Sequence, residues 1–167
     1  MSTWRAALAC AAAAVALLGA CGGESEPDFK LDSSPRVADD EGVLTAASRQ
    51  RVTLDGERSY EVSDELVSFS TYDRSVQPLL GFEKRYVQVG LRDDKVIWLA
   101  GIGAVVPGEP PRVFYTGSLR RVDKGRAYFV DGTVLRLADG LAAPPSGQKV
   151  QARIDVKTRR VAEFVGG

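Results

Sequence analysis

The sequence predicts an all-β protein, and three observations support this. Beyond the N-terminal residues, no stretch repeats its apolar residues with the 3.6-residue period of an α-helix. Apolar and polar residues alternate instead, as in 86–91 and 150–156, which is typical of strands with one buried face. Asp-Gly pairs, which favour tight hairpins, separate some of these runs. We therefore expect two similar, small, antiparallel, barrel-like modules after a signal peptide and a disordered tether.

Composition permits a folded protein but hides an uneven distribution of charge. The 167 residues are 44% hydrophobic and 26% charged, which suits one ordinary domain or two very small ones. The formal net charge is zero, yet residues 22–41 hold seven acids and two bases, a net of −5. Residues 112–167 hold 11 bases and five acids, a net of +6. This basic third is either a solvated surface or a face for an anionic partner.

The N-terminus has the layout of an export signal. Arg5 gives a positive start, and an unbroken apolar run extends from Ala6 to Leu18. As a helix this run would span only about 20 Å, whereas a bilayer core measures roughly 30 Å. Its length instead suits the apolar region of a signal peptide, here residues 1–20. The alternative interpretation of this apolar run is a transmembrane anchor.

The last residue of the apolar run and the three that follow it resemble the lipobox of bacterial lipoproteins: Leu18, Gly19, Ala20 and Cys21. The alternative is an ordinary secretory signal with an incidental cysteine. The resemblance implies that residues 1–20 are removed and that Cys21 carries the lipid. It also implies attachment to the outer face of the cell membrane, or to the outer membrane in a Gram-negative cell. Cys10 would leave with the signal, so the mature chain would hold no free thiol and no disulfide.

Residues 21–41 are predicted to form a lipidated, acidic, flexible tether. They are rich in Gly, Ser, Pro and acids and poor in apolar residues, so they cannot bury enough surface to offset their ordering entropy. The run Asp39-Asp40-Glu41 could suggest calcium, but it lacks the ligand spacing of a calcium loop. We therefore expect these acids to be solvated.

The first module is predicted at 42–103, with two hairpins. Asp55-Gly56 joins 51–54 to 58–62, and Asp93-Asp94 joins 86–91 to 95–100. A linker at 104–112 is predicted to separate the modules, because its Pro and Gly residues break strands.

The second module is predicted at 113–167 and repeats the first in outline. Asp131-Gly132 joins 127–130 to 133–137, and Lys157-Thr158 joins the last two strands. A shift of about 75 residues places Leu44 on Leu119 and nearly superposes the two Asp-Gly pairs, which suggests an internal duplication. The pattern of turns and valines resembles small OB-like or SH3-like barrel modules of secreted bacterial proteins, many of which have no assigned function.

The sequence offers little catalytic chemistry. It contains no histidine, and both cysteines are accounted for by the export signal, so a zinc or thiolate site is not expected. We predict no catalytic residue, no metal and no cofactor. Asp55 and Asp131 could form the carboxylate pair of a hydrolase, but turn chemistry explains both. A Ser–Lys pair drawn from Ser118 or Ser146 with Lys124 or Lys149 lacks the strained turn of a nucleophile.

Aromatic and basic residues on the predicted strands supply a candidate ligand face. An OB-like surface can stack rings against a ligand and contact anions with arginines; the alternative is that the rings belong to the core. The candidate residues are Trp98, Tyr115, Arg120, Arg121, Arg126, Tyr128 and Arg153.

These features together predict a non-enzymatic binding or interaction module, anchored to the membrane through Cys21 at the cell envelope. The expected partners are an envelope protein or an anionic cell-wall polymer, and export argues against nucleic acid. The alternatives are a structural envelope protein that stabilises a partner complex and a carboxylate-dependent hydrolase.

Overall fold

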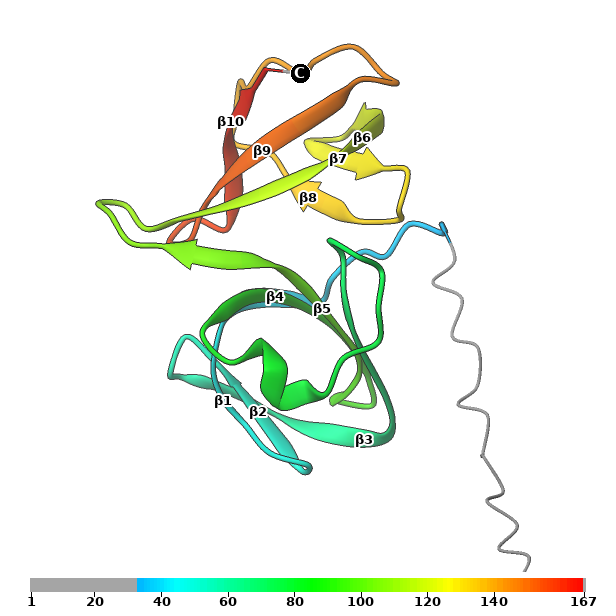
Figure 1. Ribbon diagram of the computed structural model, residues 1–167, viewed down its shortest axis with the longest axis vertical. Coiled ribbons are helices and arrows are strands. Elements are labelled where there is room, and N and C mark those ends of the chain that lie inside the picture. The colour runs from blue at the N-terminus through cyan, green and yellow to red at the C-terminus, as the bar shows by residue number, and fades with distance from the viewer. Residues whose placement is uncertain (1–32, 167) are drawn as a thin grey trace, which may run out of the picture.

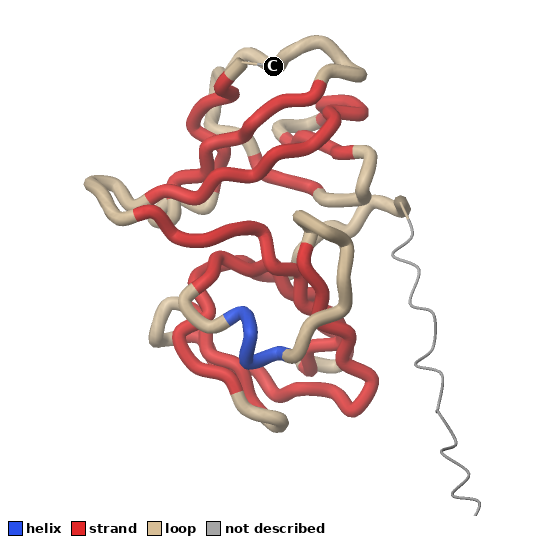
Figure 2. Tube along the Cα trace, in the orientation of Figure 1, coloured by secondary structure: helices blue, strands red, loops and turns tan. Residues whose placement is uncertain are grey.

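Strands make up almost all of the regular structure, which confirms the all-β prediction (Figure 2). The computed structural model describes residues 33–166. The predicted signal peptide, the lipobox and Cys21 lie outside these residues. In chain order the described elements are β1 (Asp40–Ala47), β2 (Arg51–Leu54), β3 (Arg58–Ser70), the 3-10 helix η1 (Leu79–Phe82), β4 (Arg85–Arg92), β5 (Lys95–Val106), β6 (Arg112–Asp123), β7 (Arg126–Phe129), β8 (Val134–Arg136), β9 (Lys149–Asp155) and β10 (Arg160–Val165).

The first five strands form a ring (Figure 1). The order of pairing is β1-β2-β3-β5-β4, and β4 pairs back onto β1. Every pair is antiparallel except β3–β5, and this is the strand order of an OB-type barrel. Helix η1 lies between β3 and β4 and places Phe82, which is fully buried, among the side chains that fill the ring. These are Leu44, Val52, Leu54, Val87, Val89, Val96 and Leu99.

The last five strands pair in the same order. β6 pairs with β7 and β9, β7 pairs with β8, and β9 pairs with β10. A single parallel bridge from Leu137 to Val161 connects the end of β8 to β10. A separate apolar core fills this group and includes Tyr115, Leu119, Phe129, Leu135, Val150, Ala152 and Ile154. The common origin of the two strand groups stays a prediction.

Strand β5 continues past the predicted module boundary at residue 103. It extends to Val106, and its last residues pair with β6 through Val105–Val113 and Val106–Arg112. Ile102, only 4% exposed, packs into the core of the second strand group. The beginning of the predicted linker 104–112 is therefore strand, because its apolar residues find a partner in β6. Its last residue, Arg112, begins β6, and the turn between β5 and β6 takes up residues 107–111.

The end of the predicted tether is also structured. Arg36 forms an isolated bridge with Thr133, beside the turn between β7 and β8. Asp40 begins β1, and the side chain of Glu41 is buried within that strand. For Asp40 and Glu41 the expectation of solvated acids is wrong, because Arg58, Arg136 and Arg159 pair with them. Asp39 is exposed, as expected, and accepts the backbone N–H of Leu91.

Two of the predicted hairpin turns have the expected backbone. Asp55 and Gly56 both have positive φ, at 52° and 77°, and they join β2 to β3. Asp93 and Asp94 also have positive φ, at 51° and 61°, between β4 and β5. Local turn chemistry therefore decides both connections.

The third turn, at Asp131-Gly132, differs from the prediction. It does join β7 to β8, but only Gly132 has positive φ, at 87°. The Gly132 N–H donates to the carbonyl of Phe129 at 3.1 Å, which makes the turn one residue longer than expected. The Asp131 carboxylate is thereby free to accept the backbone N–H of Thr133 at 2.9 Å.

Candidate functional site

Three of the predicted ligand-face residues lie together on the β6–β7 hairpin. Arg120, Arg121 and Tyr128 line a surface hollow of 380 Å³, and Pro35 of the N-terminal segment completes it. The β6–β7 register shifts between Leu119 and Arg121, so the side-chain alternation is interrupted there. This bulge lets two consecutive arginines line one hollow. We call these four lining residues the arginine surface.

The guanidinium of Arg121 lies 4.4 Å from the centre of the Tyr128 ring, a cation–π contact. Within residues 33–166, neither Arg120 nor Arg121 forms an ion pair. Arg153 and Arg160 of the same strand group differ, because each lies 2.7 Å from a carboxylate oxygen. The arginine surface therefore holds two exposed positive charges that no carboxylate of the described chain neutralises.

Arg126 is exposed on β7, directly opposite Arg136 of β8 and Asp123 of β6, and it does not line the hollow. The Nε of Arg136 is also 3.5 Å from the buried carboxylate of Glu41.

The other predicted ligand-face residues lie elsewhere. Tyr115 is 3% exposed: its ring packs edge-on against Phe129 with centroids 4.7 Å apart, and its hydroxyl donates to Asp131 at 2.7 Å. Burial raises the pKa of Tyr115, and the nearby Asp131 adds to the shift. Tyr115 is therefore a core residue, as the alternative interpretation held for the rings, and is not available to a ligand.

Trp98 belongs to the first strand group and is partly buried. It lies across Gly90 of β4, where an added Cβ would be only 1.9 Å from the indole nitrogen. Arg153 lies on β9 and pairs with Glu163 at 2.7 Å. The structure thus brings together Arg120, Arg121 and Tyr128, and leaves Trp98 and Arg153 outside the hollow that they line.

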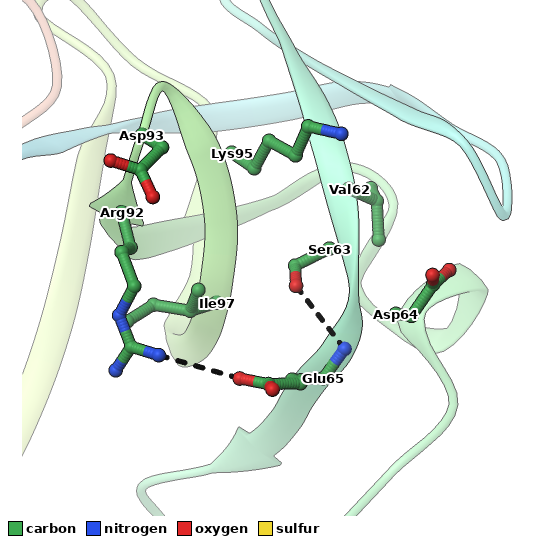
Figure 3. A pocket seen from close by; sticks show the side chains of 8 residues that line it. All are labelled: Val62, Ser63, Asp64, Glu65, Arg92, Asp93, Lys95 and Ile97. Carbon is green, nitrogen blue, oxygen red and sulfur yellow. Dashed lines mark hydrogen bonds and ion pairs between the residues drawn. The ribbon is translucent and has the colours of Figure 1, made fainter.

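A second hollow, which the sequence analysis did not identify, lies between β3 and the β4–β5 hairpin (Figure 3). It measures 390 Å³, and we call it the β3–β5 groove. Polar and charged side chains dominate its lining, together with two partly buried aliphatic ones. The lining residues are Val62, Ser63, Asp64, Glu65, Arg92, Asp93, Lys95 and Ile97. The polar run Ser63-Asp64-Glu65 within an otherwise alternating strand was the signal available in the sequence.

The acids of the predicted tether take part in a third cluster, where the two strand groups meet. Arg58 of β3 pairs with both Asp40 and Asp55. Arg159, from the β9–β10 turn, reaches the same carboxylates at 3.6 and 3.3 Å. The hydroxyl of Tyr60 donates to Asp40 at 2.6 Å. Charged side chains from both strand groups thus pair with one another here, and the cluster holds the two groups together. We call it the inter-group cluster.

Glu41 continues the inter-group cluster into the protein interior. Its carboxylate is 2% exposed and accepts the side-chain amide of Gln88 at 2.9 Å. The same amide donates to the carbonyl of Val134 at 2.8 Å. Burial raises the pKa of Glu41, against the opposing effects of Gln88 and Arg136. The side chains of β1 and β4 are therefore hydrogen-bonded to the second strand group through buried polar atoms.

The carboxylates considered for hydrolysis are both occupied by neighbours. Asp55 forms ion pairs with Arg58 and Arg159. Asp131 accepts hydrogen bonds from the hydroxyl of Tyr115 and the backbone N–H of Thr133. Such contacts agree with the turn chemistry expected for both residues.

Ser118 lies directly opposite Lys149 in the β6–β9 ladder. No hydrogen bond joins these two side chains in the described part of the chain.

Comparison of the chain with protein-family models, curated proteins and solved structures found no match. Among the described residues, no helix is long and apolar enough to cross a membrane. In the same part of the chain, no group of three or more acidic, Cys or His side chains is placed to hold a metal ion. The geometry of the surfaces is therefore the basis for any functional proposal.

Proposed function

We propose that the protein is a lipid-anchored envelope protein that binds an anionic cell-wall polymer on its arginine surface. The observation that carries the proposal is the pair of unneutralised guanidinium groups, Arg120 and Arg121, beside the ring of Tyr128. Guanidinium groups bind phosphate and carboxylate through paired hydrogen bonds, and an adjacent aromatic ring offers a flat surface to a sugar.

The position of the N-terminal segment agrees with an anchored binding module. Pro35 lines the arginine surface and lies 14 positions after Cys21, the proposed lipid attachment site. A chain of that length spans at most about 50 Å when fully extended. An anchor on Cys21 would therefore keep the arginine surface within the layer of polymer next to the membrane.

Binding of polyphosphate, a simple linear polyanion, tests this function. Arg121→Gln should weaken binding about tenfold or more, because it removes a charge-assisted hydrogen bond. Binding should also depend less steeply on salt, since one fewer charge is neutralised. Arg160→Gln is the matched control: it removes the same charge from a partly exposed arginine that already pairs with Asp139. Equal affinities for the two variants would refute the assignment.

The anchor is tested separately by the intact mass of the native protein beside a Cys21→Ser variant. We expect the wild type to lack residues 1–20 and to carry acyl chains, and the variant to remain uncut. A soluble, unacylated wild type would refute the anchor without affecting the arginine surface.

A further inference from the structure

The ladder between β3 and β5 is interrupted at the β3–β5 groove. Val62 pairs with Val96, and the next pair is Val67 with Trp98, so four residues of β3 face one residue of β5. On the other side of β3, pairing with β2 ends at Glu61, and one further hydrogen bond joins the Val62 N–H to Gln50. In the described chain, residues 63–66 therefore have no ladder partner on either side.

A short length of strand edge is thus exposed inside a hollow. The N–H of Glu65 is satisfied locally, since it donates to the hydroxyl of Ser63 at 3.2 Å. Residues 64–66 are in register with no other strand of the described chain. Unpaired strand edges are templates for an added strand, and extended peptides bind many domains in this way. The partly buried side chains of Val62 and Ile97 supply apolar contact beside the edge.

Charge in the groove favours a cationic ligand. Arg92 lies 3.4 Å from Glu65, and Lys95 lies 3.4 Å from Glu61, so each base already has an acid as partner. The carboxylates of Asp64 and Asp93 have no ion pair in the described chain. The lining of the groove holds three acids and two bases, a net charge of −1.

The groove can open at little cost. The Arg92–Glu65 contact spans it, as the dashed line in Figure 3 shows, and both side chains are more than 60% exposed. Ion pairs this exposed contribute little to stability. A ligand that enters the groove can therefore replace the contact without disturbing the core.

We propose that the β3–β5 groove binds an extended, basic peptide segment of a partner protein, which adds as a strand along residues 63–66. The peptide backbone pairs with the free edge of β3, and lysine or arginine side chains reach Asp64 and Asp93. Anionic polymer on the arginine surface and a protein in the groove would then be held by one molecule. The groove does not depend on the arginine surface, so either assignment can fail alone.

Two peptides of identical charge separate strand addition from simple attraction. The first is a labelled heptapeptide, Thr-Lys-Val-Lys-Val-Lys-Thr, and the second is the same peptide with N-methylated valines. N-methylation keeps the charges but removes backbone donors, so binding should weaken about tenfold or more. Amide hydrogen exchange of the full chain should show protection of residues 63–66 only with the first peptide.

Protein variants test the charge contribution. Asp64→Asn and Asp93→Asn should each weaken peptide binding about two- to fivefold, the range expected for exposed ion pairs. Asparagine suits position 93, where φ is 51°, because it tolerates the left-handed region. Asp139→Asn is the matched control, since Asp139 is exposed and pairs with Arg160 in the other strand group. Arg121→Gln should leave peptide binding unchanged.

Three outcomes would overturn the proposal. Equal binding of the two peptides would mean attraction without strand addition. Protection elsewhere, with residues 63–66 unaffected, would place the peptide at another site. Protection of residues 63–66 by a soluble cell-wall glycan fragment, and not by the peptide, would assign the groove to a saccharide.

Discussion

Replacing Gly101 with alanine tests how tightly the first ring is packed. Gly101 lies on β5, and the ring of Phe82 from η1 lies directly over it. Phe82 is fully buried, and it connects the 3-10 helix to the core of the ring. An added methyl group therefore competes with Phe82 for the same space.

The magnitude follows from the distances. A Cβ on Gly101 would lie 2.4 Å from Cε1 and 2.5 Å from Cδ1 of Phe82. Carbon atoms in contact are normally about 3.5–4.0 Å apart, so the ring must retreat by about 1 Å. Overpacking of this kind costs about 1–3 kcal/mol, and complete loss of a buried phenylalanine costs about 3–5 kcal/mol. We expect the free energy of unfolding to fall by about 2–4 kcal/mol.

Urea denaturation followed by tryptophan fluorescence measures this loss. The matched control is Gly81→Ala, next to Phe82 in the chain, where an added Cβ meets nothing within 4 Å. It should change the free energy of unfolding by no more than about 0.5 kcal/mol. If Gly101→Ala were as stable as Gly81→Ala, the position of Phe82 over β5 would be incorrect.

Three further substitutions test other parts of the fold. Val150→Asp places a charge on a side chain that is 3% exposed, so we expect a loss of more than about 3 kcal/mol or no folding; a wild-type thermal melt would contradict the strand register. Tyr115→Phe removes the 2.7 Å hydrogen bond to Asp131 and should cost about 1–3 kcal/mol in urea denaturation, whereas an unchanged midpoint would argue against that bond. Burial raises the pKa of Glu41 above its ordinary value of 4.5, so ionised Glu41 opposes folding. The stability of wild type relative to Glu41→Gln should therefore fall as pH rises above 4.5, and a difference independent of pH would exclude the shift.

Local features of the sequence predicted the hairpins well. Asp55-Gly56 and Asp93-Asp94 fix their turns because residues with positive φ suit a two-residue connection between twisted strands. The alternation around Val150 predicted its burial for a similar reason, because one face of β9 packs on the core. In each case the information lies within a few residues.

The missed features depend on distant parts of the chain. Asp40 and Glu41 resemble solvated tether residues until Arg136 and Arg159, about 100 residues later, pair with them. Tyr115 lies in an apolar run, Val113 to Tyr115, in which alternation does not show which face is buried. The β3–β5 groove arises from a shift in register between two strands; the polar run 63–65 marks its place in β3 but does not specify the shift.

The continuity of β5 determines how the two proposed surfaces could act together. One strand, Lys95–Val106, belongs to the first ring and also pairs with β6, so no flexible hinge separates the strand groups. Two ligands on one scaffold gain avidity, up to about 10²–10⁴-fold, only when their spacing matches that of the sites. A flexible linker would accept many spacings. In this molecule the spacing of the two sites is fixed by the fold. Avidity would therefore be gained only where the polymer and the protein partner lie at that separation.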